Sequence, residues 1–126
     1  MKSDAFRRAA EAKDFAAGAE LFSEDVTFKS PVVFKPYEGR DALSVVLGAV
    51  VQVFEDFRYS GQVEDGDTAV LMFEARVGER EIQGVDILRF SAEGLIQELT
   101  VMVRPMSGMH ALAEEMRKML EAAGAV

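Results

Sequence analysis

The residue best placed to do chemistry in this chain is Asp86, the one acid in the apolar, alternating segment 84–90. Alternation puts Gly84 and Leu88 on its own face, and strand pairing would put Leu71 and Leu99 beside it. A carboxylate is costly to bury as an anion among such neighbours. Asp86 is therefore expected either to stay protonated or to bond a ligand. A structural buried acid bonded to a tyrosine or serine fits the same pattern, so both interpretations stand.

Three other side chains carry chemistry of their own. Tyr59 is expected on an inward strand face, where it would reach Asp86, although an ordinary core tyrosine fits the same pattern. Ser30 precedes a proline and has no nearby base to activate its hydroxyl, so we interpret it as a pocket-lining or turn residue. His110 falls in the first turn of the last expected helix and is interpreted as a surface residue. It would become a general base only if that helix covered a cavity mouth.

Charge and composition argue against several classes of function. Acidic residues number 22 and basic residues 14, and this net charge of −8 disfavours nucleic acid as a partner. One histidine without cysteine argues against a zinc site, and no cofactor motif such as a glycine-rich phosphate loop occurs. No apolar run reaches the ~18 residues of a membrane span. The expectation is a single domain over residues 1–126, located in the cytoplasm.

Periodicity predicts both helices and strands. Helices are expected at 3–13, at 15–22, at 40–54 and from Ser107 onward; a break is expected at 23–25 and a turn at 37–39. Strands are expected at 26–30, 57–63, 69–75, 82–90 and 95–103. The valines of 40–54 favour a strand by propensity, but the spacing of Leu43, Leu47 and Val50 and the length of the run favour a helix. The last helix should bury a stripe formed by Met109, Leu112, Met116, Met119 and Ala123.

The last four strands are predicted to form an antiparallel meander. The shortest loops consistent with alternation place Leu71 opposite Asp86 and Phe73 opposite Gly84. The outward positions are too apolar for a solvated sheet face, which predicts a homodimer through that face. These outward residues are Val70, Met72, Val85, Ile87, Ile96, Thr100 and Met102.

Three segments, 14–31, 37–43 and 84–90 with 94–96, together resemble the nuclear-transport-factor-2-like (NTF2-like) superfamily, in its SnoaL-like and ketosteroid-isomerase-like branch. The resemblance implies an α+β fold, NTF2-like or cystatin-like. Its strongly curved antiparallel sheet forms a cone, with N-terminal helices packed on the concave face and a further helix at the C-terminus. It also implies a deep apolar cavity. Isomerases, polyketide cyclases, dehydratases and proteins without catalysis share this fold.

The resemblance also assigns positions to the isomerase machinery. Asp86 matches the protonated acid that holds the oxyanion, whereas Ser30 stands at the position of the base and Phe6 at that of a tyrosine. Serine without a partner is a poor base and phenylalanine donates no hydrogen bond, so a standard ketosteroid isomerase is not expected. An epoxide-hydrolase arrangement fails too, because Gly84 and Val101 replace its arginine and second aspartate.

Three hypotheses follow for the function. The first is a cavity that binds a small hydrophobic molecule, such as a cyclic ketone or polyketide-like compound, anchored at Asp86. The second is an isomerase, cyclase or dehydratase that uses Asp86 as oxyanion donor or general acid–base. The third is an interaction module with a vestigial cavity. The expected ligand-binding residues are Phe28, Ser30, Phe54, Tyr59, Leu71, Phe73, Leu88, Leu99 and Val101.

Overall fold

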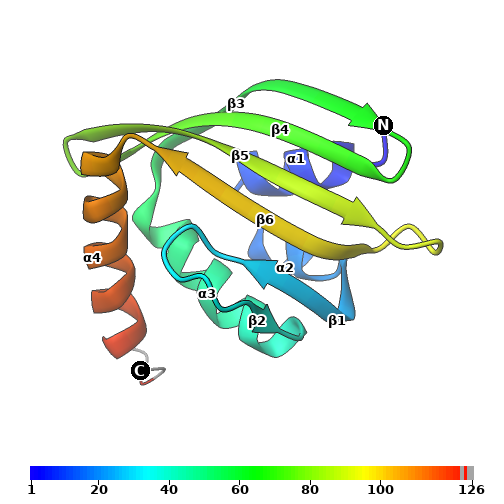
Figure 1. Cartoon of the computed structure of the whole chain (residues 1–126), viewed down its shortest axis with the longest axis horizontal. Helices are drawn as coiled ribbons and strands as arrows, with labels where there is room; N and C mark the ends of the chain where they lie inside the picture. The colour runs from blue at the N-terminus through cyan, green and yellow to red at the C-terminus, as the bar shows by residue number, and fades with distance from the viewer. Residues whose placement is uncertain (123, 125–126) are drawn as a thin grey trace.

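The computed structural model describes residues 1–122 and 124, and its centre is one curved sheet (Figure 1). The helices of the described part are α1 (Asp4–Glu11), α2 (Phe15–Ala19), α3 (Arg40–Val53) and α4 (Met106–Ala122). The strands are β1 (Phe22–Lys29), β2 (Tyr37–Glu38), β3 (Glu55–Asp65), β4 (Thr68–Val77), β5 (Arg80–Phe90) and β6 (Ile96–Arg104). Helices α1, α2 and α3 lie on one side of the sheet and α4 stands at its end (Figure 1). The predicted α+β class is confirmed.

The six strands lie in the order β2-β1-β6-β5-β4-β3. Strand β1 runs parallel to β6, and the other neighbouring pairs are antiparallel. The predicted meander is confirmed, together with its register: Leu71 pairs with Asp86, and Phe73 pairs with Gly84. This register puts Leu71 and Phe73 on the buried face of the sheet, because side chains two residues apart share a face.

Two predicted boundaries near the start of the sheet were wrong. The second helix ends at Ala19 instead of residue 22, and β1 begins at Phe22, so residues 23–25 belong to a strand and are not a break. The cause is long-range pairing: Phe22 pairs with Ile96 of β6 and is almost completely buried, which outweighs local helix propensity. Likewise Tyr37 and Glu38, predicted as a turn, form β2 against β1.

The predicted outward position of Ile96 was also wrong. Ile96 is only 1% exposed, whereas the neighbouring Gln97 is exposed. A register shift between Arg89 and Phe90 in the β5–β6 pair explains this exchange, since a one-residue slip moves side chains to the opposite face.

Residues Arg40–Val53 form helix α3, so the helix predicted from spacing is confirmed over the strand favoured by the valines. Its buried residues are Leu43, Val46, Ala49 and Val53, which recur every three or four positions and face the sheet side of the molecule. Helix α4 buries Leu112 and Met116 from the predicted stripe; Ala123 lies outside the described residues. No helix among residues 1–122 is long and apolar enough to cross a membrane.

The start of the chain is tied to the far end of β3, and this sets the position of α1. Ser3 is fully buried, and both its backbone N–H and its hydroxyl donate to Glu64, at 3.0 and 2.8 Å. The side-chain amide of Gln62 donates to the Ser3 hydroxyl at 2.7 Å. Because Glu64 and Gln62 lie on β3, these bonds hold α1 across the strand that carries Tyr59.

The pair of Phe73 and Gly84 yields a stability prediction. A Cβ at Gly84 would overlap the Phe73 ring and lie 2.5 Å from the Met102 carbonyl oxygen, so Gly84→Ala should destabilise by about 1–3 kcal/mol. A Cβ at Gly48, in α3, would meet nothing within 4 Å, so Gly48→Ala should stabilise by about 0.5–1 kcal/mol. Urea unfolding of both variants measures the difference. Equal stability of Gly84→Ala and wild type would contradict the ring-over-glycine packing.

Candidate functional site

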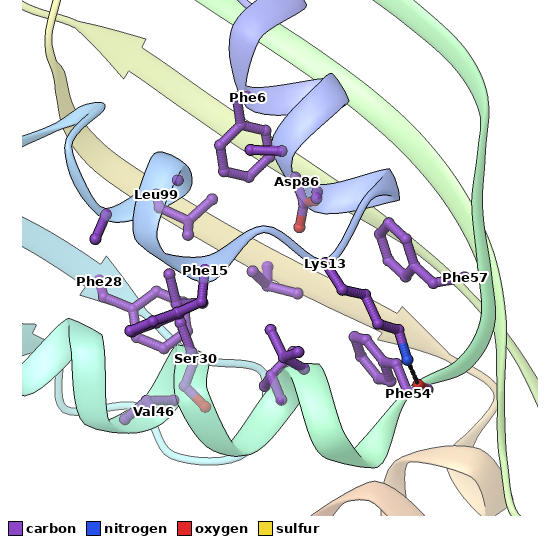
Figure 2. Close-up of a pocket in the computed structure, with 18 of the residues that line it drawn as sticks. Phe6, Lys13, Phe15, Phe28, Ser30, Val46, Phe54, Phe57, Asp86 and Leu99 are labelled. Atoms are coloured by element: carbon purple, nitrogen blue, oxygen red, sulfur yellow. Dashed lines mark hydrogen bonds between the residues drawn. The ribbon is translucent and has the colours of Figure 1, made fainter.

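A pocket of about 140 Å³ opens between the sheet and helices α1–α3. Its walls are almost wholly apolar, and Figure 2 shows aromatic side chains from several elements around it. Seven of the residues expected from the sequence line it: Phe28, Ser30, Phe54, Tyr59, Asp86, Leu99 and Val101. These residues come from four strands, a helix end and a loop. The structure therefore brings together residues that lie far apart along the chain.

Three expected residues, Leu71, Phe73 and Leu88, are packed in the core and are not among the lining residues. Phe73 shows the reason, because the rings of Phe54 and Phe57 pack against it with centroids 5.8 and 5.0 Å away. Those rings take the positions that face the pocket. A role for these three residues in ligand contact stays a prediction that the geometry does not favour.

Helical residues supply lining that the sequence interpretation missed. Helix α3 contributes Val46, Leu47, Val50 and Val51, and α4 contributes Leu112 and Met116. Their helical spacing was visible in the sequence, but it indicated only a buried face. Which part of that face borders a hollow depends on how far the helix stands from the sheet.

Asp86 and Tyr59 form the polar centre of the pocket. Asp86 is 7% exposed, and the Tyr59 hydroxyl donates to its Oδ2 atom at 2.6 Å. Tyr59 lies on β3 and Asp86 on β5, with β4 between them, so the phenol reaches across a strand. A register shift between Tyr59 and Gly61 marks an irregularity in β3 at this point, and such bulges redirect neighbouring side chains.

The environment of this pair favours its protonated forms. Burial raises the pKa of Asp86 from 3.8 to about 7, and the hydrogen bond from Tyr59 opposes part of that rise. Burial, followed by the charge of Asp86, raises the pKa of Tyr59 as well, so the phenol keeps its proton. The pair is thus a hydrogen-bonded acid whose charge state changes near neutral pH.

Neighbouring groups fix the Tyr59 ring. Phe57 packs edge-on against it at a centroid distance of 5.0 Å, and the Arg7 guanidinium lies 5.9 Å above it. The Tyr59 backbone N–H donates to Glu11 of α1 at 3.3 Å. These contacts come from α1 and from β3 itself, so the phenol is held in one orientation toward Asp86.

The two residues assigned to the isomerase positions both line the pocket. Phe6, on α1, lies near Asp86 in Figure 2, and Ser30 lies across the pocket from that carboxyl. The Ser30 hydroxyl accepts the Val32 backbone N–H at 3.0 Å, a local turn contact, and no described histidine or lysine bonds it. His110 is exposed and outside the lining. Within residues 1–122 and 124, no cluster of three or more acidic or histidine side chains could hold a metal ion.

The chain belongs to the family of SnoaL-like domains, whose family model matches residues 4–99. The resemblance stated from sequence is thereby confirmed. No curated protein matched the chain. A solved structure of a steroid Δ-isomerase from Pseudomonas aeruginosa is 42% identical, covers 99% of this chain and 93% of its own, and superposes with a TM-score of 0.92.

Two further solved structures support the same fold. A protein with a cystatin-like fold from Silicibacter pomeroyi is 32% identical, with 98% of this chain and 87% of its own covered and a TM-score of 0.93. An NTF2-like protein from Cytophaga hutchinsonii is 20% identical, with 85% of this chain and 93% of its own covered and a TM-score of 0.66. At that lower identity the likeness concerns the fold alone.

The raised pKa of Asp86 yields a prediction for Asp86→Asn. Because the folded-state pKa, about 7, exceeds the unfolded value of 3.8, the unfolded chain releases its proton first as pH rises. As pH rises from 3.8 to about 7, the free energy of unfolding of wild type should therefore fall relative to that of the Asp86→Asn variant, by up to about 1.4 kcal/mol per pH unit. At pH 7 Asp86→Asn should be as stable as wild type or more stable. Urea unfolding at pH 4, 5.5 and 7 measures this.

The opposite result has a clear meaning. If Asp86→Asn loses substantial stability at pH 7, Asp86 is an ionised and well-bonded structural carboxylate. Tyr59→Phe serves as the companion variant, because it removes the hydrogen bond that lowers the pKa of Asp86. The pKa of Asp86 should then be higher, so the free energy of unfolding of this variant should keep falling with pH to a higher pH than that of wild type.

Proposed function

We propose that this protein binds a small, mostly apolar carbonyl compound in the pocket, with Asp86 and Tyr59 as its polar contact. The observation that carries the proposal is the hydrogen-bonded Tyr59–Asp86 pair in an otherwise apolar pocket. A hydrogen-bonding pair in such walls gives a ligand one oriented contact and leaves the rest of the binding to apolar surface. Ligand pockets of proteins are commonly built this way.

The number of protons on the pair decides what it can hold. When Asp86 is protonated, the pair has two acidic protons, one in its mutual hydrogen bond and one free to donate to a ligand carbonyl. When Asp86 is ionised, the single remaining proton lies between Tyr59 and Asp86. Donation to a neutral carbonyl therefore requires the protonated carboxyl, which a pKa of about 7 maintains below neutral pH.

The size of the pocket favours a ligand with one ring. Its volume of about 140 Å³ compares with the ~150 Å³ of an apolar protein cavity known to hold benzene. Drug-sized ligands occupy pockets of about 300–1,000 Å³. A steroid would require the walls to move apart, so a smaller cyclic ketone is the better match.

The alternative is an isomerase, cyclase or dehydratase. It is favoured by the 42% identity to a protein named as a steroid Δ-isomerase and by the pKa of Asp86 near 7, which suits general acid–base catalysis. In that case Asp86 would stabilise an enolate or carry the proton. Phe6 and Ser30 weigh against a standard ketosteroid isomerase, because Phe6 cannot donate a hydrogen bond to the oxyanion and Ser30 is a poor base without a partner.

The test is the binding of 4-methylacetophenone, a single-ring ketone. Its affinity, measured by amide chemical shifts in NMR titrations from pH 5.5 to 8.5, should fall as Asp86 ionises near pH 7. In Asp86→Asn the affinity should not vary with pH, because an amide donates throughout this range. The aromatic hydrocarbon p-xylene is the matched control ligand, and its binding should show no such dependence.

Two results would speak against the proposal. If neither compound shifts the amides of pocket residues, the pocket does not bind such molecules; if both bind with the same pH profile, Asp86 is not their contact. Mixing the protein with a 3-oxo-Δ5 steroid and following absorbance of the conjugated enone separates a binding protein from an isomerase. Turnover at the rate of true isomerases would mean that the assignment of Phe6 and Ser30 was wrong.

The outer face of the sheet supports a homodimer as a second part of the proposal. Met72 and Met102 are 37% and 55% exposed there, and Val85 lies between them in a shallow groove. The groove also includes Glu74 and Arg104, so it offers both charges to a second copy. A two-fold contact could place each charge against its opposite while covering the apolar residues.

A cytoplasmic location, suggested by the absence of cysteine, also remains a proposal.

Sedimentation velocity at micromolar concentration should show a dimer, and Met102→Glu should shift it to a monomer by placing charge in the contact. Val45→Glu is the control, because Val45 is 46% exposed on α3, away from this groove. It should leave the dimer intact. A monomeric wild type would remove the proposal of self-association.

A further inference from the structure

Lys13 places a positive charge on the rim of the pocket. It is the one cationic side chain among the described lining residues, and it comes from the connection between α1 and α2. Its Nζ atom donates to the Phe54 carbonyl oxygen at 2.8 Å, at the end of α3, so the side chain spans from one wall to the other (Figure 2). Asp86, which is 7% exposed, lies farther inside the pocket than the exposed Lys13.

The backbone at Lys13 adopts a conformation that suits glycine better. Its φ angle is +54°, and backbone hydrogen bonds from Lys13 to Ala10 at 3.1 Å and from Asp14 to Ala9 at 2.9 Å hold this geometry. Side chains with a Cβ adopt positive φ in only a few per cent of cases, and here the conformation is that of the residue that ends helix α1 in a Schellman motif. The turn alone would be satisfied by glycine, so the structure of the turn does not account for a lysine.

The charge of Lys13 has no partner of opposite sign within the described residues. Among the described residues, no carboxylate lies within 4.0 Å of its Nζ atom. The neighbouring Asp14 carboxylate accepts the Ala17 N–H at 3.1 Å as the cap of α2. An ammonium has three donors, and the Phe54 carbonyl uses one, so two remain for a ligand.

The two polar ends of the pocket differ in what they accept. The inner end offers a proton from the Tyr59–Asp86 pair, which suits a carbonyl oxygen, but among the described lining residues it has no cationic side chain to balance the full charge of a carboxylate. The walls between the ends are apolar, with Val50 and Phe57 among them, and a charge left there would be costly. The rim is open to water and carries the ammonium of Lys13 together with the carboxylate of Asp14, whose Oδ1 atom accepts the Ala17 N–H. Because Lys13 is the one cationic residue of the described lining, an anionic group is accommodated best at its Nζ atom.

We propose that the pocket takes a keto acid: an apolar ring or short chain with its carbonyl at Tyr59 and Asp86 and its carboxylate at Lys13. This inference rests on the proposed function of the same pocket and names its ligand class. Lys13 would act as a selecting residue that exchanges its contact with the Phe54 carbonyl for the ligand carboxylate. The two free donors of its ammonium would serve this exchange.

The experiment compares 4-acetylbenzoate with the neutral 4-methylacetophenone by NMR titration at pH 6. Wild type should bind the acid about fivefold more tightly, the scale of a partly exposed ion pair, and high salt should reduce this preference. Lys13→Gly should abolish the preference, so that its affinities for the acid and for the neutral ketone become similar. Because glycine adopts positive φ without strain, this variant should unfold at a temperature no lower than wild type.

Lys13→Met and Lys35→Met complete the set. Lys13→Met removes the charge but keeps the length of the side chain, and it should lose the preference as Lys13→Gly does. Lys35 is exposed and outside the pocket lining, so Lys35→Met changes net charge equally and should keep the preference. If the ketone binds but the acid is not preferred, or if Lys13→Gly retains the preference, the inference is wrong and the proposed function stands. If neither probe binds, the proposed function itself fails.

Discussion

The hydrogen bond between Tyr59 and Asp86 is the interaction on which the site depends. Asp86 is nearly completely buried, and among the described residues this bond is its one polar side-chain contact. Burial without enough partners is what raises its pKa to about 7. The same lack of partners keeps the carboxyl protonated at pH values where an ordinary aspartate is ionised. A better-satisfied carboxylate would ionise at lower pH and would have nothing to donate.

The pocket exists because the helices are held away from the sheet. Ser3 binds Glu64 at one end of α1, and Glu11 accepts the Tyr59 N–H near the other, so α1 is fixed along β3. Aromatic rings then fill the space beside Tyr59, while smaller aliphatic residues of α3 leave room on the opposite wall. The pocket therefore depends on how the helices are anchored to the sheet, and α1 is anchored by specific polar contacts.

The SnoaL-like scaffold separates fold from chemistry. This chain superposes closely on a protein named as a steroid Δ-isomerase, and Phe6 and Ser30, which the sequence resemblance assigns to the positions of a donor and a base, line its pocket. The shape requires apolar side chains of suitable size at many positions, and many sequences satisfy it. Catalysis requires particular functional groups at a few positions, so it can disappear without disturbing the shape.

The sequence by itself determined the register of the meander, including the opposition of Leu71 and Asp86, because alternation and short turns are local properties. It also indicated Asp86 as the candidate site by its apolar surroundings, without choosing between a ligand and Tyr59 as its partner. Only the tertiary structure decided that Phe22 starts a strand, that Ile96 turns inward and that Lys13 reaches the pocket rim. These features depend on contacts between segments distant in the chain, and local periodicity carries no information about such contacts.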